Sequence, residues 1–482
     1  MQDEERRSRH RLIALGFLTE FGYLSIGHPA TPLAVKVGIQ SAMFLLYLAA
    51  IHEACRRPFR NHQAWAFLGL GILFRVTLLF QGPFYSGDLY RYLWDGHVQV
   101  AGHLNPYRYA PADPILAPLH NDIQPLVNHP DIPTLYPPVA QVLFAAVALA
   151  GGTVVGIKAL MVFFDLAQMF LLRVMLGRAE LSAGRVLIYA WSPLVITEVA
   201  GNGHLDAVAI FFLILGIHLI IVARPRLSTL ALGLAAGAKA LPLLVFPVLA
   251  GRIPKRFWML PFALIGLFYL PYLGAGKALV AGLLEYAERW QHNDSLFRIL
   301  LRGLEALDPT PPLKSIIQWL QSLLGDPSWI PFLYRHAYPV YLARLAVFAA
   351  LAGLAVWLAV KKTPPLRGTT WMLCAMILLS PTVHPWYLLW LVPFLPFFPS
   401  RAWLLLTGLV SLSYLDPGPV ASGVTTHQWV RWAEYLPFFG LLLWDGIQSR
   451  RSRVATLFGL PNYSEPEMNS LSPPMEAPAR ES

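Results

Sequence analysis

Long apolar runs recur along the whole chain and constrain its fold more than any other feature. The hydrocarbon core of a bilayer is about 30 Å thick, so a spanning helix needs roughly 20 mostly apolar residues. Of the 482 residues, 56% are hydrophobic and only 13% are charged, whereas soluble domains carry roughly 25% charged residues. Apolar segments lie near residues 12–27, 33–52, 63–81, 156–176, 186–200, 204–222, 257–273, 336–360, 369–381, 385–399, 402–415 and 429–447. We therefore predict an all-α polytopic membrane protein with about twelve transmembrane helices.

Clusters of Lys and Arg orient these segments, because loops rich in these residues stay on the cytoplasmic side. Placing every basic cluster inside puts both termini in the cytoplasm and leaves four stretches outside. These outer stretches are residues 82–134, 201–206, 274–335 and 380–386. The net charge of +10 then belongs mostly to cytoplasmic loops, and it indicates no nucleic-acid partner. Simple alternation of every apolar run is the alternative, and it would place residues 201–206 inside.

The charge rule holds only if two apolar segments do not cross the membrane. Residues 136–151 must stay on the outer side as a re-entrant or interfacial helix. Residues 228–250 must enter and leave on the cytoplasmic side, with Lys239 and Pro242 at the tip of the hairpin. The helix from Ser228 rises about 18 Å to this tip. An ammonium at that depth needs a counter-charge, from an anionic ligand or from an acid of another span.

The predicted domain organisation is simple. Residues 1–460 form one transmembrane domain, with its large outer loops at 82–134 and 274–335. This segment shows no internal repeat, and many transporters are built from two related halves. Residues 461–482 lack apolar periodicity and are predicted to form a disordered cytoplasmic tail.

The outer stretch FYSGDLYRYLWDGHVQVAGHLNPY concentrates polar chemistry directly after an apolar run. The pair Ser86-Gly87 predicts the start of a short helix that ends near Gly102. One face of this helix carries Asp88, Tyr92, Asp95 and Gln99, with Arg91 beside them. We expect Arg91 to keep Asp88 ionised, and Tyr85, Tyr90 and Trp94 to sit at the level of the lipid headgroups. The alternative is an interfacial helix whose acids simply face water.

Four further groups of polar residues fall in outer stretches or at span ends. They are His129, Asp131 and Tyr136; Glu198, His204 and Asp206; Glu285, Arg289, His292 and Asn293; and His384 between two prolines. Each group alone has a structural explanation, since a histidine near an interface is more often a hydrogen-bonded structural residue than a ligand. Together with Lys239 they predict an outward-facing cavity with carboxylates on one side and cations on another. Such a cavity suits a substrate that is both phosphorylated and hydroxylated.

The chain resembles bacterial GT-C glycosyltransferases, which use polyprenyl-phosphate sugars, over residues 80–460. The closest group is the mannosyltransferases of glycosyltransferase family 87 and their relatives. The resemblance is carried, in order, by the blocks GDLYRYLWDGHVQVAGHLNPYRYAP, NHPDIPTLYPP, GHLDA, GLAAGAKALPLL, ERWQHNDSLF and SPTVHPWYLLWLVPF. It implies a GT-C-type fold in the bacterial inner (cytoplasmic) membrane, with the active site facing the periplasm or the outside. The two spans that precede the first large outer loop go beyond the minimal pattern.

The resemblance also implies roles for individual residues. Asp88, the first acid of the first large outer loop, occupies the position of the catalytic base. Lys239, His384 and Arg289 match positions that face the phosphate of the donor. We assign the remaining site residues to substrate shaping: Arg91, Tyr92, Asp95, His129, Tyr136, His204, Asp206 and Asn293.

The chemistry of the transfer limits the groups that it needs. A sugar hydroxyl that attacks an anomeric carbon needs one base, and a departing lipid phosphate needs its growing charge stabilised. A retaining mechanism would need two carboxylates about 5–5.5 Å apart, whereas Asp95 lies two helical turns from Asp88, about 10 Å along the axis. We therefore predict inverting transfer of a hexose, with mannose favoured, from a polyprenyl-phosphate donor to a lipid or glycan acceptor. No cofactor is predicted; Mg²⁺ or Mn²⁺ could bind the acids and histidines, but the scheme does not require a metal.

Three other functions remain open from the sequence. In a transporter or flippase for lipid-linked sugars, Lys239 and the acids would line a translocation path. A glycan ligase would transfer a whole glycan at a similar site. A structural subunit of an envelope complex would not need a base at Asp88.

Overall fold

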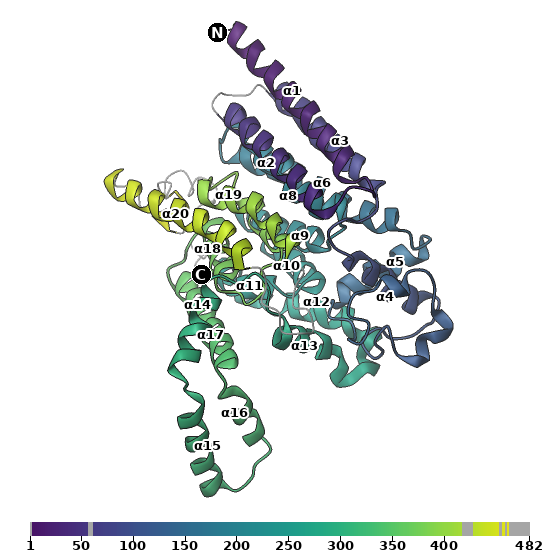
Figure 1. Cartoon of the computed structure of the whole chain (residues 1–482), viewed down its shortest axis with the longest axis vertical. Coiled ribbons are helices and arrows are strands. Elements are labelled where there is room, and N and C mark those ends of the chain that lie inside the picture. Colours follow the sequence, from purple (N-terminus) through teal and green to yellow (C-terminus); the bar gives the residue numbers. More distant parts are fainter. Residues whose placement is uncertain (1, 56–60, 417–427, 453–455, 458–459, 462–482) are drawn as a thin grey trace, which may run out of the picture.

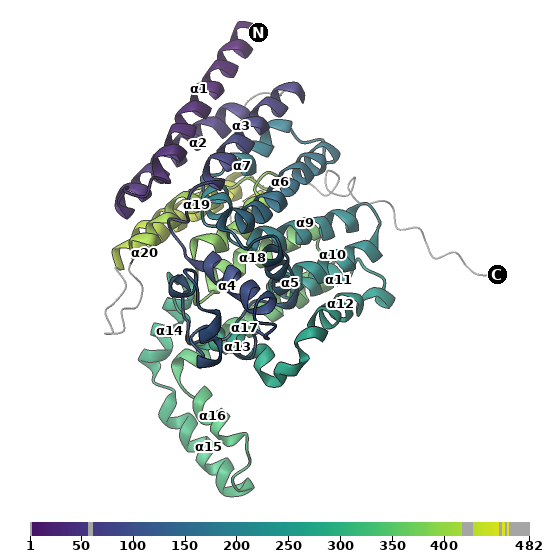
Figure 2. The same cartoon turned by 90° about the vertical axis from the view of Figure 1, so that its right-hand side faces the viewer.

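The computed structural model describes residues 2–55, 61–416, 428–452, 456–457 and 460–461. Helices dominate these ranges, which confirms the all-α prediction (Figures 1 and 2). The described strands are β1 (Thr456–Leu457) and β2 (Leu460–Pro461), which pair antiparallel. The predicted disordered tail lies outside the described residues apart from Pro461.

Three long helices begin the chain and lie together at one end of the molecule (Figure 1). They are α1 (Gln2–Ile26), α2 (Leu33–Cys55) and α3 (Asn61–Leu79). On α3, the fully buried Arg75 forms an ion pair with the equally buried Asp165. Asp165 also accepts a hydrogen bond of 2.6 Å from the Tyr189 hydroxyl. This interior ion pair ties three segments of the apolar body together.

The first outer stretch folds into short helices. They are α4 (Asp88–Val100), η1 (Pro114–Leu119), η2 (Gln124–Leu126) and α5 (Pro138–Leu149). The helix predicted from Ser86-Gly87 is thus confirmed as α4, which packs against α5. The 12 residues of α5 rise about 18 Å, which is short of a bilayer's apolar thickness. Residues 136–151 therefore suit a segment that does not cross the membrane.

The next region contains a broken helix. Its elements are α6 (Val154–Arg178), η3 (Ala183–Val186), α7 (Leu187–Ala190), α8 (Pro193–Val195), η4 (Ile196–Gly201) and α9 (Asp206–Ile221). The span predicted at 186–200 is broken, because Pro193 has no N–H to donate and begins a new helix. Segment η4 is a π-helix, a form that occurs mostly as single turns, frequently at functional sites.

The predicted hairpin follows. Its first helix ends just before Lys239 and its second begins at Pro242, as predicted. The elements are α10 (Pro225–Ala238), α11 (Pro242–Ala250), η5 (Lys255–Phe257), α12 (Leu260–Tyr269), η6 (Leu270–Val280) and α13 (Ala281–Arg289). Lys239 is extended between α10 and α11 and meets Asp206. Past α11, Arg252 donates a 2.8 Å hydrogen bond to the backbone oxygen of Lys362. The tip of the hairpin therefore lies at the Asp206 end of α9, and α11 returns toward a basic loop.

An arm of helices projects from the body before the chain returns to it (Figure 1). The arm comprises α15 (Thr310–Leu324) and α16 (Ile330–His336), while α14 (Leu296–Leu307) lies at its base. The returning elements are α17 (Pro339–Val360), α18 (Pro365–Leu379), η7 (Pro385–Trp390), η8 (Val392–Phe394), α19 (Arg401–Leu409), η9 (Val410–Leu415) and α20 (Gln428–Ser452). At the base of the arm, α14 packs on α17 and α18.

Four helical stretches of the described chain are long and apolar enough to cross a membrane. They are Leu33–Cys55, Val154–Arg178, Lys255–Arg289 and Pro339–Val360. Shorter apolar helices of 10–17 residues accompany them. These features make the chain a membrane protein, while the total of about twelve spans stays a prediction.

Candidate active site

Hydrogen bonds bring the predicted outer stretches together in one polar region. Asn202, in the turn before α9, accepts hydrogen bonds from the backbone N–H groups of Phe84 and Tyr85 at 3.2 and 3.1 Å. His292 exchanges two backbone hydrogen bonds, of 3.0 and 2.8 Å, with residues 381–383. Segments that are far apart in sequence thus form one site at the N-terminal end of α9.

Asp88 is the first residue of α4 and is half-buried. Its carboxylate accepts a hydrogen bond from Asn128 Nδ2 at 3.3 Å, and its backbone N–H donates to Ser86 Oγ at 3.3 Å. A carboxylate has about four acceptor sites, so these long contacts leave it free to accept a proton from a substrate. The N-terminus of a helix also stabilises a negative charge. The surroundings of Asp88 therefore suit a general base.

Asp95, about two turns further along the same face of α4, has the opposite environment. It is 2% exposed, and it accepts hydrogen bonds from Arg91 Nε at 2.8 Å and from Gln141 Nε2 at 3.0 Å. Arg91 lies one helical turn before Asp95 and pairs with it, whereas the sequence analysis had assigned it to Asp88. Through Gln141 on α5, Asp95 fixes the packing of α4.

Two aromatic residues of this stretch pack against other parts of the protein. Trp94 is 1% exposed and belongs to a small core of the outer loop, which also contains Val98 and Leu116. Tyr85 stacks face to face on Tyr414, with ring centres 4.3 Å apart. Trp94 is therefore buried in the core of the outer loop and Tyr85 packs on the body, while the predicted headgroup depth stays a prediction.

Lys239 finds its counter-charge in Asp206, the first residue of α9. Its Nζ donates to both carboxylate oxygens, at 2.7 and 2.6 Å. Trp390 Nε1 donates to the same carboxylate at 2.6 Å. The Asp206 side chain is fully buried, while that of Lys239 is 23% exposed. Of the two predicted sources of counter-charge, the structure shows the acid from another span, and part of the Lys239 side chain remains exposed.

A stack of four rings joins the other outer segments. His204 packs on Trp386 at 4.2 Å, Trp386 on His384 at 4.3 Å, and His384 on His292 at 4.8 Å between ring centres. Burial lowers the pKa of His384 well below 6.5, and nearby cations, His292 first, lower it further. A lowered pKa favours the neutral imidazole, which can donate one N–H hydrogen bond, and the role of His384 at the donor phosphate stays a prediction.

Two tyrosines lie beside the Lys239–Asp206 pair. Tyr286 on α13 and Tyr387 on η7 share a hydrogen bond between their hydroxyls. On the other side, the Leu89 side chain, next to Asp88, lies against Gly203, three residues before Asp206. Lys239 Nζ lies 5.7 Å from the centre of the Tyr387 ring. Asp88 and Lys239 therefore border the same polar region.

Arg289 lies apart from this cluster. Its side chain is 66% exposed and pairs with Glu285 on the same helix at 2.5 Å. The contacts given for the described residues do not join it to Lys239 or His384. Its predicted role at the donor phosphate stays a prediction.

Most of the other residues assigned to substrate shaping are buried and contact neighbouring side chains. Tyr92 packs edge-on against Tyr136 at 4.9 Å, and both are at least 92% buried. Asn293 is 2% exposed and donates to Glu434 at 2.7 Å. His129 is exposed and packs edge-on against Trp290 at 4.7 Å. Of this group, His129 is the residue with free access to a substrate.

Several residues of the site were missed by the sequence analysis. They are Tyr286, Tyr387, Trp390, Glu434 and Asn202. Tyr387 and Trp390 lie inside the block SPTVHPWYLLW. The motif that indicated His384 could therefore also have indicated these two aromatic residues. Glu434 is an isolated acid within an apolar run, and the cost of burying such a charge marks it as paired or functional.

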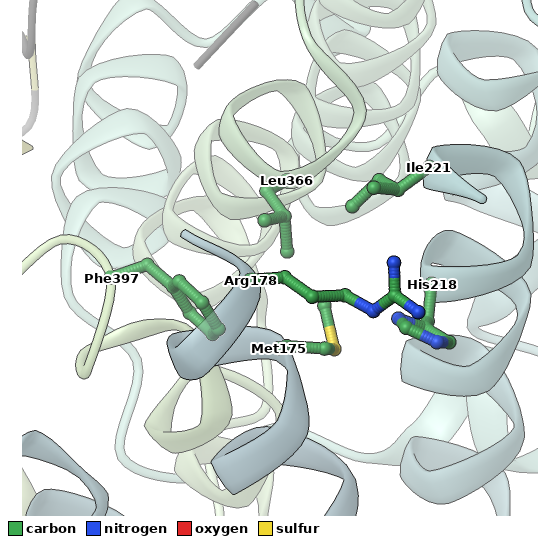
Figure 3. Close-up of a pocket in the computed structure, with 6 residues that line it drawn as sticks. All are labelled: Met175, Arg178, His218, Ile221, Leu366 and Phe397. Atoms are coloured by element: carbon green, nitrogen blue, oxygen red, sulfur yellow. The ribbon is translucent and has the colours of Figure 1, made fainter. Parts of the chain in front are cut away.

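A small pocket lies at the far end of the same helices (Figure 3). Its lining residues are Met175, Arg178, His218, Ile221, Leu366 and Phe397. His218 stands 12 residues after Asp206 on α9, about 18 Å along the axis. The pocket is therefore separate from the polar region, and its Arg178 belongs to a basic loop.

The donor set of the site also bears on metal binding. Among the residues that the structure describes, no group of three or more His, Cys, Asp or Glu side chains could hold a metal ion. Asp206 and Asp95 are occupied by Lys239 and Arg91. That the reaction requires no metal stays a prediction.

Membrane helices around a buried cluster of acids, a lysine and histidines are the architecture expected for a membrane-embedded transferase. Residues 16–253 match the N-terminal domain of the alpha-(1->6)-mannopyranosyltransferase family, and residues 338–415 match the MptB C-terminal domain. The two matches cover about two thirds of the chain. The chain belongs to this mannosyltransferase family, and the predicted membership of a mannosyltransferase family is confirmed. No curated protein and no solved structure matches the chain.

Proposed function

We propose that the protein is a GT-C glycosyltransferase of the bacterial cytoplasmic membrane. It transfers mannose, with inversion, from a polyprenyl-phosphate donor to a lipid or glycan acceptor at the outer face. The family supports the choice of mannose, and its name supports an α-(1→6) product linkage. Asp88, Asp206 and Lys239 fall in the first matched range and His384 in the second, whereas Arg289 falls in neither.

The observation that carries this proposal is the placement of opposite charges on one polar region. Asp88 is half-buried with spare acceptor sites, and Lys239 keeps 23% of its side chain exposed. The two groups are brought together by the packing of Leu89, next to Asp88, against Gly203, three residues before Asp206, which is the partner of Lys239. A base on one side and a phosphate-binding cation on the other are the two groups that the transfer needs.

In the proposed reaction, Asp88 accepts the proton of the attacking acceptor hydroxyl. The hydroxyl oxygen forms a bond to the anomeric carbon while the bond from that carbon to the phosphate oxygen breaks. The bonding electrons move onto the polyprenyl phosphate, whose growing charge Lys239 stabilises. His384 contributes a neutral N–H hydrogen bond to the same phosphate. A single displacement of this kind inverts the anomeric configuration.

The Lys239–Asp206 pair explains how the cation is kept in place without donor. An ammonium has three donors, and Asp206 takes two short hydrogen bonds from Lys239. Trp390 holds the carboxylate from another direction. A donor phosphate can therefore approach the exposed part of Lys239 while Asp206 keeps the side chain oriented.

The direct test is a transfer assay with the purified protein in nanodiscs. Polyprenyl-phosphate-mannose, -glucose and -arabinose are each supplied with a membrane extract as the source of acceptor. We expect transfer from the mannose donor alone. Movement of a lipid-linked sugar across vesicles, with no transfer from any donor, would overturn the proposal and favour a flippase.

The membrane face is tested by cysteine labelling in intact cells. In a background with Cys55 and Cys374 replaced by Ser, Asp122→Cys should react with an impermeant reagent and Arg178→Cys should not. Both side chains are exposed on the protein surface, so their difference reports the side of the membrane. Labelling of Arg178→Cys from outside would contradict the proposed orientation in the membrane.

A further inference from the structure

The start of α4 is held by few contacts of its own. Its N-cap residue, Gly87, has no side chain, and the nearest side-chain contact is the 3.3 Å hydrogen bond from the Asp88 N–H to Ser86 Oγ. The position of Asp88 must therefore be fixed by what packs against residues 84–89. The turn formed by Gly201, Asn202 and Gly203 occupies that place.

This turn is shaped to fit the segment. A Cβ atom at Gly201 would lie 2.9 Å from two ring carbons of Phe84. Gly203 has φ +76°, and a Cβ atom there would lie 3.3 Å from a side-chain carbon of Leu89. Between the two glycines, the Asn202 side-chain oxygen accepts both the Phe84 and the Tyr85 N–H. Residues before and after Asp88 are thus fixed by one turn.

Glu198 holds this turn in its orientation. Its carboxylate accepts a hydrogen bond from Asn202 Nδ2 at 3.1 Å, which leaves the Asn202 oxygen pointing at the Phe84 and Tyr85 N–H groups. It also accepts the Tyr414 hydroxyl at 2.8 and 2.9 Å. The Tyr414 ring stacks on Tyr85. One fully buried carboxylate therefore holds the segment through its backbone and through its aromatic ring.

The π-helix η4 sets the backbone positions of Glu198 and Asn202. The Asn202 N–H donates to Thr197 O at 2.9 Å, a bond across five residues, and the His204 N–H donates to Glu198 O at 3.0 Å. A wider turn of this kind is retained mostly where function requires it. His204 Nε2 also lies 3.2 Å from the Glu198 carboxylate, although it lacks hydrogen-bond geometry.

We propose that Glu198 is a positioning residue for the transfer, acting through Asn202 and Tyr414 on the segment that presents Asp88. The inference rests on the proposed function, in which Asp88 is the base. Glu198 does not touch the substrate and moves no proton. It sets the distance between the Asp88 carboxylate and the acceptor hydroxyl, and a misplacement of about 1 Å can cost 10²-fold in rate.

The test compares a variant that breaks the contact with one that remakes it. Asn202→Leu removes both the amide bonded to Glu198 and the oxygen that fixes Phe84 and Tyr85. The paired exchange Glu198→Gln/Asn202→Asp restores an amide–carboxylate bond with reversed polarity, and the Asp oxygen can still accept the two N–H groups. We expect Asn202→Leu to lower kcat about 10²-fold with an unchanged KM for the donor. The paired exchange should stay within about threefold of the wild type.

A double-mutant cycle with Asp88→Asn separates positioning from general support of the fold. If Glu198 and Asn202 act through Asp88, Asn202→Leu should cause little further loss in kcat in the Asp88→Asn background. Additive losses, or a lowered unfolding temperature with unchanged kcat, would overturn the inference. Normal transfer by Asp88→Asn alone would instead refute the proposed base, so the two failures are distinguishable.

Discussion

The two ends of α4 carry one carboxylate each, and their surroundings are opposite. Asp95, toward the C-terminal end, is sealed by Arg91 and Gln141 with hydrogen bonds of 2.8 and 3.0 Å. Asp88, at the N-terminal end, has one long side-chain contact at 3.3 Å and is half-buried. A satisfied buried carboxylate stabilises packing, whereas one with free acceptor sites is available for chemistry.

The same contrast separates two ion pairs of the interior. Arg75 and Asp165 are both fully buried, and Arg75 also donates to the backbone oxygens of Gly71 and Ala190. In the other pair, Asp206 is fully buried but Lys239 keeps 23% of its side chain exposed. Both pairs lie in an apolar body where charge is costly. Access to the polar region, rather than burial alone, distinguishes the functional pair.

The largest effect on stability is expected at the sealed pair. Arg75→Met leaves Asp165 buried without a counter-charge, which costs about 3–5 kcal/mol. Unfolding in mixed micelles with increasing denaturant measures this loss. Arg75→Met/Asp165→Asn should recover much of it, because no unpaired charge remains. A stable Arg75→Met variant that fails only in transfer would show that this pair belongs to the active site.

A smaller effect, on donor affinity, is expected at the open pair. Lys239→Met should weaken donor binding by about 10- to 150-fold, since a hydrogen bond to a charged group contributes roughly 1.5–3 kcal/mol. Titration of the purified protein with polyprenyl-phosphate-mannose measures the dissociation constant. Lys277→Met, at an exposed lysine of η6, is the matched control and should bind normally.

The double variant Lys239→Met/Asp206→Asn sharpens this comparison. If Lys239 contacts the donor phosphate, removing the charge of Asp206 will not restore affinity. Recovery of near-normal affinity would show that Lys239 serves only to neutralise Asp206. The open pair would then be as structural as the sealed one.

The smallest effect is a dependence of stability on pH. The pKa of His384 is lowered by burial in the folded protein, while in the unfolded chain it is about 6.5. The unfolded state therefore binds more protons below pH 6.5, and stability falls as the pH falls from that value toward the folded pKa. His384→Gln should flatten this part of the stability profile, measured by thermal unfolding. The exposed His120→Gln should leave it unchanged, and equal slopes in both variants would contradict the neutral His384.

Local patterns were sufficient to predict several parts of this structure. The i, i+4, i+7 spacing placed Asp88, Tyr92 and Asp95 on one helix, and the helix starts at Asp88. The flanking arginines and Pro242 predicted a hairpin with Lys239 at its tip, and the chain breaks there. These features depend on residues close in sequence, whose geometry is set by the period of a helix.

Partners distant in sequence could not be predicted. The Arg91–Asp95 pair is a local exception: its i, i+4 spacing is visible in the sequence, although Arg91 was assigned to Asp88. The lowered pKa of His384 depends on burial and on residues of other segments, among them His292, His204 and Lys239. The link from Glu198 through Asn202 to Phe84 spans more than 110 residues. Such contacts depend on tertiary packing, which one sequence does not reveal.

The most direct measurement compares Asp88→Asn and Asp95→Asn for single-turnover transfer and donor binding. The Asn side chain keeps nearly the same shape, so both variants should bind the donor. General base catalysis is worth roughly 10²–10⁴-fold, and Asp88→Asn should lose at least about 10²-fold in rate with unchanged unfolding temperature. Asp95→Asn should lose less in rate and unfold at a lower temperature, because its carboxylate pairs with Arg91. Near-normal transfer by Asp88→Asn, or a far deeper loss in Asp95→Asn, would contradict the assignment of the base.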